Sequence, residues 1–138
     1  MTAVTCMLVL LLVGLVAPVA AADAVTQTFA APVDRVWAVT EAILNQLGWK
    51  IDKADRSIGW ITTESRWIDG EEYGVYAKGI RHRLRVMMRA SGDKATAVSV
   101  ERSVFKRERI LFVDNDSPLT VSDRDVEKAL LSAIGKAL

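Results

Sequence analysis

An alternating row of arginines is the most pointed chemical pattern in this sequence of 138 residues. The segment GIRHRLRVMMRA, residues 79–90, holds all of its arginines at odd positions. Because successive side chains of a strand point to opposite faces, we expect one strand face to carry them all. Guanidinium groups in such a row bind anionic partners such as lipid headgroups, phosphates or an acidic protein. The candidate binding residues are Arg81, Arg83, Arg85 and Arg89.

The same arginines have an alternative interpretation as a solvated sheet face. Acidic residues are plentiful in the neighbouring segments, and exposed ion pairs contribute little to stability. Under this alternative the arginines pair across strands with Glu64, Glu101 or Glu108. Both interpretations stay open on the sequence alone.

A second candidate surface is aromatic. The segment WIDGEEYGVY, residues 67–76, places Trp67, Tyr73 and Tyr76 in an expected glycine-containing loop. Exposed aromatic rings on a loop can grip a peptide or a sugar, and they can equally fold back as a lid over a sheet. The loop is therefore a candidate binding site with a structural alternative.

Residues suited to catalysis or metal binding are few. His82 is the only histidine, and no Ser or Asp is tied to it by spacing, so we expect a structural role. The acidic run DNDSP, residues 114–118, lacks the ligand order and closing Glu of a calcium loop. We expect a turn there, followed by a helix cap in which Ser122 and Asp125 form a capping box. No catalytic residue, metal site or cofactor is predicted, and the protein is not expected to be an enzyme.

The amino-terminal segment predicts export. Residues 6–22 are apolar, carry no charge and end in small residues, which is typical of a secretory signal peptide comprising residues 1–22. Gly14 and Pro18 interrupt the run, which favours cleavage over a retained membrane anchor. Cys6, the only cysteine, precedes the apolar core, so no lipid anchor is expected. The mature chain, residues 23–138, is expected to be one periplasmic or secreted domain without disulfides.

Charge excludes one class of partner. The 18 basic residues nearly balance the 17 acidic ones, so nucleic acid is a poor partner for this exported chain. An envelope protein or an anionic membrane surface remains a candidate partner.

The elements that position these residues follow from periodicity. A strand is expected at residues 25–29, and a helix begins at Pro32 and ends before Gly48. A final amphipathic helix has its apolar stripe between Val126 and Ala137. Between the helices, two-residue alternation predicts an antiparallel meander with strands at 49–54, 59–67, 76–90, 95–104 and 107–113. The expected fold class is α+β, with both helices packed on one face of a curved sheet.

The segment from the first helix into the meander also resembles a known family. The polar run DRSIG, residues 55–59, alone predicts a hairpin turn, because Gly59 tolerates a positive φ. Together with a tryptophan-containing helix that ends in Leu-Gly-aromatic, it is similar to the repeated unit of BamC, the lipoprotein of the outer-membrane β-barrel assembly machine. The residues that carry the resemblance are Trp37, Leu47, Gly48, Trp49, Asp55, Arg56 and Gly59.

The resemblance implies a helix-grip domain and a role in outer-membrane protein assembly. The chain departs from the family, because it lacks the lipidated cysteine and has room for one such domain rather than two. We therefore expect an exported, non-enzymatic binding or assembly module of the cell envelope. The alternative is a carrier that holds a small apolar ligand or lipid between helix and sheet. Trp37, Leu44 and Leu130 discriminate the two, since they either fill a core or line a void.

Overall fold

The computed structural model describes residues 24–138. The predicted signal peptide, its cleavage before Asp23 and the position of Cys6 lie outside the described residues. Within the described part, two helices and seven strands follow one another along the chain. Their bounds are β1 (Val25–Phe29), α1 (Val33–Gln46), β2 (Ile51–Asp55), β3 (Trp60–Thr63), β4 (Arg66–Glu72), β5 (Ala77–Ala90), β6 (Thr96–Ile110), β7 (Val113–Leu119) and α2 (Asp125–Ala137).

All seven strands form one antiparallel sheet built on a central long hairpin. β5 and β6 pair without a register shift from Ala77 opposite Arg109 to Ala90 opposite Thr96. The hairpin end near residue 90 is flanked by β3 and β2 on one side and by β1 on the other. Its opposite end is flanked by β4 and β7. The sheet therefore has two parts that share the β5–β6 hairpin.

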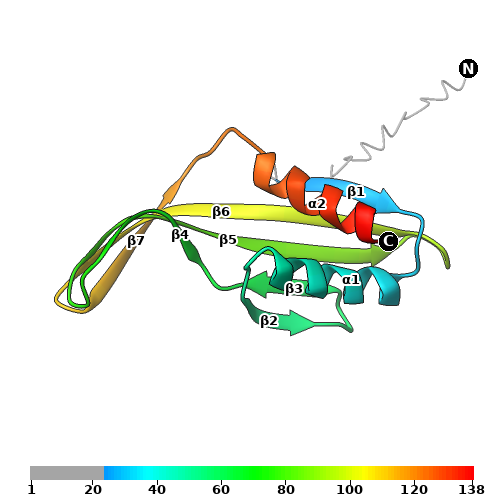
Figure 1. The fold of residues 1–138 in the computed structure, drawn as a ribbon, viewed down its shortest axis with the longest axis horizontal. Helices are drawn as coiled ribbons and strands as arrows, with labels where there is room; N and C mark the ends of the chain where they lie inside the picture. The colour runs from blue at the N-terminus through cyan, green and yellow to red at the C-terminus, as the bar shows by residue number, and fades with distance from the viewer. Residues whose placement is uncertain (1–23) are drawn as a thin grey trace, which may run out of the picture.

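These two parts differ in their cover. Both helices lie over β1, β3 and the adjoining halves of β5 and β6, whereas the other half projects sideways without a helix (Figure 1). We call the helix-covered part the body. The projecting part is the arm, formed by β4, β7, residues 77–82 of β5 and residues 104–110 of β6. The arm ends in two neighbouring hairpin turns, at residues 73–76 and 111–112.

The core confirms the predicted α+β class with both helices on one sheet face. Trp37 and Leu44 of α1 and Leu130 of α2 are buried in a single hydrophobic cluster. Leu84 and Val86 of β5 belong to the same cluster, together with Val98 and Val100 of β6. The even-numbered side chains of β5 therefore meet the helices, which leaves the odd-numbered ones on the uncovered face.

Three predicted strand bounds were wrong in an instructive way. Residues 59–67 contain all of β3 and the start of β4, because the chain leaves β3 at Thr63 and then pairs with a different stretch of β5. Residues 95–113 form one continuous strand to Ile110 and then a turn, since β5 opposite is equally long. The strand at 76–90 was predicted almost as it is, but its pairing partners, which set both outcomes, cannot be read from local periodicity.

The predicted acidic loop and the predicted helix cap were also wrong. Residues 114–118 lie in β7, where they pair with β6. The helix α2 begins at Asp125 without a side-chain cap, so Ser122 and Asp125 form no capping box. Instead, the backbone N–H of Asp125 donates to Oδ1 of Asp123 at 3.4 Å. At the end of α1, Gly48 has a φ of +81°, the left-handed conformation that commonly ends a helix.

The DRSIG turn joins β2 to β3, as the hairpin prediction required. Oδ1 of Asp55 accepts a hydrogen bond from the backbone N–H of Ser57 at 3.0 Å. Gly59 has a φ of +78°, and its carbonyl accepts the backbone N–H of Met88 at 2.7 Å. A Cβ atom at Gly59 would lie 2.3 Å from the carbonyl oxygen of Met88. The turn is thus fixed against β5 by a contact that only glycine allows.

Candidate functional site

The arginine face is the odd-numbered face of β5 and comprises Arg81, Arg83, Arg85 and Arg89. The predicted alternation is confirmed: His82, Leu84, Val86 and Met88 are buried, and Arg83, Arg85 and Arg89 are exposed. This face carries no helix, because both helices lie on the opposite side of the sheet. It can therefore meet solvent or a partner directly.

Arg81 differs from the other arginines of this face. It is half-buried, and its guanidinium donates to Oγ of Ser65 at 2.9 Å and to the Ser65 carbonyl at 2.6 Å. The same group lies over the ring of Trp67, 4.5 Å from its centroid. Arg81 therefore holds β5 against the start of β4, and its charge is already engaged.

The three remaining arginines are not neutralised in the predicted way. Glu64 pairs with Lys50 at 4.0 Å, and Glu108 pairs with Lys106 at 2.9 Å. Glu101 lies opposite Arg85 in the ladder, but no ion pair within 4.0 Å joins them. Among the described residues, Arg85 and Arg89 line a hollow of about 670 Å³ on this face together with Met87, Ser99 and Glu101. The functional interpretation of this face and the solvated one both stay predictions.

A second set of arginines on the arm is engaged in ion pairs. Arg107 binds Asp116 through two nitrogens, at 2.8 and 2.9 Å. Arg109 donates to Asp114 at 2.7 Å and to Glu72 at 2.7 Å. These hydrogen bonds lower the pKa of all three carboxyl groups, and they raise the pKa of both guanidinium groups. The ladder joins β6 to β7 and to β4, so it stiffens the arm.

The sequence analysis missed this ladder because it placed the acidic residues in a loop. Asp114 and Asp116 stand at alternate positions, as do Arg107 and Arg109. Acid and base at alternate positions on either side of a short apolar run predict a hairpin with cross-strand pairs. This signal was available in the sequence.

The free end of the arm is apolar. The turn between β6 and β7 has only two residues, Leu111 and Phe112, with φ values of +50° and +67°. Their exposed fractions are 66% and 75%. The backbone N–H of Phe112 donates to the carbonyl of Val75 at 3.2 Å, which ties the two hairpin turns together. We call this end the tip; its exposed apolar side chains are Tyr73, Tyr76, Ile110, Leu111, Phe112 and Val113.

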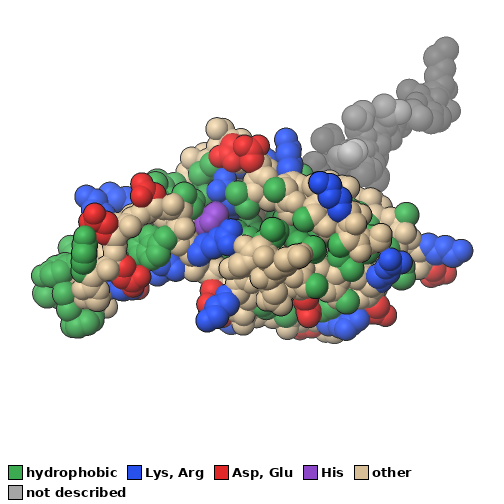
Figure 2. Space-filling view, in the orientation of Figure 1, with side chains coloured by type: hydrophobic (Ala, Val, Ile, Leu, Met, Phe, Trp, Pro, Cys, Tyr) green, Lys and Arg blue, Asp and Glu red, His purple; other side chains and the backbone are tan. Residues whose placement is uncertain are grey.

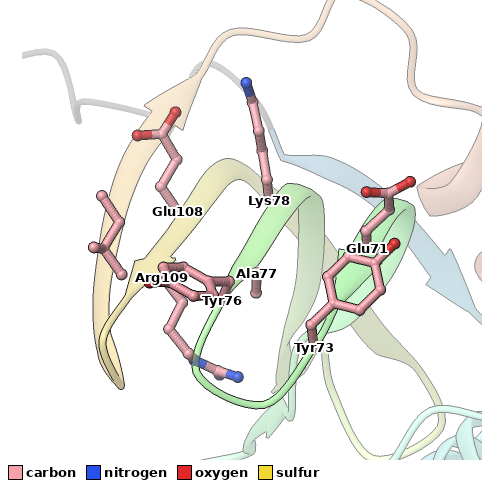
Figure 3. A pocket seen from close by; sticks show the side chains of 8 residues that line it. Glu71, Tyr73, Tyr76, Ala77, Lys78, Glu108 and Arg109 are labelled. Atoms are coloured by element: carbon pink, nitrogen blue, oxygen red, sulfur yellow. The ribbon is translucent and has the colours of Figure 1, made fainter.

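Figure 2 shows hydrophobic side chains gathered at the free end of the arm. A hollow of about 400 Å³ lies beside the tip, between the two hairpins. Lys78 and Glu108 point to the same side from neighbouring strands, with Tyr73 and Tyr76 at the turn below them (Figure 3). The hollow and the tip thus share their tyrosines.

The prediction that three aromatic residues lie in a loop was correct for the two tyrosines and wrong for Trp67. Tyr73 and Tyr76 flank the β4–β5 turn and are exposed. Trp67 lies within β4 rather than in a loop, half-buried, and its Nε1 donates to Glu72 at 3.1 Å. Both tyrosines line a hollow over the arm together with Ala77, Lys78 and Glu108, so the grip and the lid both stay predictions.

Ile110, Leu111, Phe112 and Val113 were not recognised as a site, because the run was assigned to a strand. Hairpin turns of two residues favour Asn-Gly or Asp-Gly, which accept positive φ. An apolar run of four residues nevertheless breaks two-residue alternation, and such a run on a surface calls for a functional reason. That break was the signal.

His82 lies at the junction of body and arm, within a group of cations. Its ring packs on Trp49, with the centroids 4.7 Å apart. Nε of Arg66 and Nη1 of Arg102 lie 3.4 Å from its two ring nitrogens. Burial, followed by the two positive charges, lowers the pKa of His82 to about 4. His82 is therefore neutral at pH 7, and its polar neighbours here are arginines rather than a nucleophile or a carboxylate.

Beyond His82 the polar network continues into α2. Arg102 donates to the buried carboxylate of Glu127 and to Asp123, and Arg66 donates to the carbonyl of Leu47 at the end of α1. In residues 24–138, no group of His, Cys, Asp and Glu side chains is arranged to hold a metal ion. Helices of this same part are too short or too polar to cross a membrane.

No protein-family model matches this sequence, and none of the curated proteins is significantly similar to it. The resemblance to BamC therefore stays a prediction.

Proposed function

We propose that this protein is an exported, non-enzymatic binding module of the cell envelope that engages its partner through the arm. The observation that carries the proposal is the tip, where large apolar side chains are exposed at the end of a projection whose strands are joined by ion pairs. A monomeric domain seldom exposes such a contiguous apolar group unless it binds something.

The backbone at the tip supports this proposal. Leu111 and Phe112 occupy positions with positive φ, which side chains other than Gly, Asn and Asp adopt at a cost of roughly 1 kcal/mol or more each. A turn selected for stability alone would carry Asn-Gly. A strained turn with two exposed apolar residues is better explained by a contact that the free domain does not make.

The fold supports a helix-grip domain, which is the finer class that we propose. A strand, a helix, an antiparallel meander and a last helix follow in the expected order. The residues of the BamC resemblance also have coherent roles: Trp37 and Trp49 are buried, and Gly48 and Gly59 have positive φ. A BamC-like role in outer-membrane protein assembly is consistent with a binding arm.

The carrier alternative has less support. Trp37, Leu44 and Leu130 are all buried, and they belong to the same hydrophobic core cluster. The hollow at the tip lies outside that cluster, and the hollow over the arginine face shares only Met88 with it. The discriminating residues thus favour a filled core over a ligand cavity between helix and sheet.

The test compares capture of envelope components by the parent protein and by a tip variant. Leu111→Asn with Phe112→Gly removes both apolar side chains and installs the preferred sequence for such a turn, so the fold should be retained or stabilised. Ile58→Asn is the matched control, because Ile58 is equally exposed but lies in the β2–β3 turn of the body. Chemical cross-linking in envelope extract should give adducts that the tip variant loses and the control retains. Identical adducts from all three proteins would contradict the proposal.

A further inference from the structure

We propose that the tip inserts into the interfacial region of a lipid bilayer whose headgroups are zwitterionic. This inference rests on the proposed function, since it names the partner that the arm engages. It commits to lipid rather than to a protein groove or to a second copy of the chain.

The shape of the tip favours a planar, fluid partner. The apolar side chains come from both hairpin turns and gather at the end of the arm (Figure 2). A protein would need a socket to enclose such a convex end, whereas lipid adapts to it. The tyrosines suit the boundary as well, because a ring with a terminal hydroxyl prefers the level of the headgroups.

Hydrogen bonding at the tip is compatible with a low dielectric. Backbone groups in lipid must find partners within the protein. The N–H of Phe112 is bonded to the carbonyl of Val75, and the N–H of Tyr73 to the carbonyl of Tyr76 at 2.7 Å. The two hairpin turns that would enter the lipid are therefore joined by a backbone hydrogen bond.

The charged residues behind the tip limit the depth of insertion. Only the turn and the adjoining pair, Ile110 and Val113, are apolar before the ladder reaches Arg109 and Asp114. The apolar part therefore reaches into a bilayer by roughly 5–10 Å, the depth typical of interfacial segments. Such a tip rests in the interface and does not span the membrane.

These charges also indicate the lipid class. The first two ladder positions behind the turns carry two basic residues against four acidic ones, a net charge of −2: Lys78 and Arg109, with Glu71, Glu72, Glu108 and Asp114. Arg109 is already bound to Asp114 and Glu72. An anionic surface would repel this collar, whereas the ammonium of a zwitterionic headgroup complements it.

The exposed arginines that line the hollow, Arg85 and Arg89, lie too far away to change this preference, although Arg81 is near enough to Glu72 to lower its pKa. Arg89 lies twelve residues beyond Ala77 along β5, roughly 40 Å in an extended strand. That separation exceeds the screening length of about 10 Å at 0.1 M salt. Binding through the tip should therefore be insensitive to salt, unlike binding through the arginines.

The test is flotation with vesicles of phosphatidylcholine, with and without added phosphatidylglycerol. The parent protein should float with phosphatidylcholine alone, with little change at about 0.5 M salt and no gain from the anionic lipid. Leu111→Asn with Phe112→Gly should weaken partitioning by about a hundredfold, because two large apolar side chains no longer leave water. Ile58→Asn and Arg85→Ser with Arg89→Ser should both float like the parent. Circular dichroism checks that each variant is folded.

Several outcomes would overturn the inference. A parent protein that stays unbound, or a tip variant that floats equally well, would exclude insertion of the tip. Binding that needs phosphatidylglycerol and is lost in the arginine variant would assign lipid contact to the arginine face. A dimer in sedimentation velocity that the tip variant dissolves would assign the tip to a second copy. If the protein does not bind vesicles but a cross-linked protein adduct depends on the tip, the inference is wrong and the proposed function stands. If neither vesicle binding nor an adduct depends on the tip, both are wrong.

Discussion

Glu127 of α2 and Arg102 of β6 form an ion pair that is almost wholly excluded from solvent. Nε of Arg102 lies 3.1 Å from Oε1 of Glu127, and the two side chains are 6% and 0% exposed. The second oxygen, Oε2, has no hydrogen-bond partner among the described residues, although Nε of Arg124 lies 3.8 Å away. The pair thus fixes the last helix to the strand that continues into the arm.

Glu127→Ala should be strongly destabilising. Removal of one partner from a buried ion pair leaves the other charge uncompensated, at a cost of about 3–5 kcal/mol. Asp123→Ala is the matched control, because Asp123 binds the same arginine at 3.3 Å but is half exposed. It should cost less than about 1 kcal/mol. Chemical denaturation measures both, and equal costs would show that the buried pair has no special weight.

The stability of the fold should depend on His82 between pH 4 and 6.5. Its pKa falls from an ordinary value of 6.5 to about 4 in the folded state. Within that window the unfolded chain binds a proton that the folded chain does not, so the free energy of unfolding decreases as the pH falls. The loss is at most about 3 kcal/mol and is complete below the folded pKa. Above pH 6.5 this residue contributes no pH dependence.

His82→Gln should flatten this part of the profile. His82 is the only histidine, so other side chains with ordinary pKa values leave most of the window clear. Thermal denaturation at several pH values checks the prediction. A variant whose profile has the same slope as the parent's between pH 5 and 6.5 would contradict it.

Much of the body was predicted from local sequence, whereas the arm was not. Periodicity identified both helices, and Gly48 and Gly59 marked real left-handed positions. The hairpins of the arm are local, but they were missed because residues 114–118 were assigned to a loop and residues 110–113 to a strand. The turn at Leu111 and Phe112 was not recognised, because these two residues are typical of strands, whereas a two-residue turn usually contains Asn and Gly.

The candidate site shows the same division. Alternation correctly placed the arginines of β5 on one face, but it could not tell that Arg81 is held by Ser65 while Arg85 is not. That difference depends on the end of β3, where the chain leaves one part of the sheet and starts β4. Two-residue alternation predicts which face of the sheet a side chain lies on, but the contacts of that side chain depend on how the strands are connected and paired.

Gly59 should tolerate no side chain, for a reason separable from its φ. Gly59→Ala places a Cβ atom 2.3 Å from the carbonyl oxygen of Met88, and Gly92→Ala places one in open space. Both glycines have φ near +80°. Gly92→Ala should therefore cost about 1 kcal/mol for backbone strain alone, and Gly59→Ala clearly more. Equal losses in denaturation would show that the β2–β3 turn can move away from β5.

Arg81 and Arg85 should differ in their effect on stability. Arg81→Ser removes two hydrogen bonds to Ser65 and the stacking on Trp67, and should cost about 1–3 kcal/mol. Arg85→Ser removes an exposed side chain and should stay within about 0.5 kcal/mol. Urea denaturation compares them. A large loss of stability in Arg85→Ser would show that Arg85 already has a partner side chain within the protein. Arg85 would then no longer be a candidate binding residue.

Arg83, Arg85 and Arg89 should bind an acidic partner if the arginine face is functional. Replacement of all three by Ser leaves the core untouched, because these side chains lie on the face without helices. Under the functional interpretation, capture of an acidic envelope protein weakens sharply in the triple variant, and capture by the parent falls steeply with salt, since exposed charges are screened within about 10 Å at 0.1 M. The tip variant serves as the control, because its arginines are intact and lie far from the substitutions. Equal capture by parent and triple variant would restore the interpretation of these arginines as a solvated face.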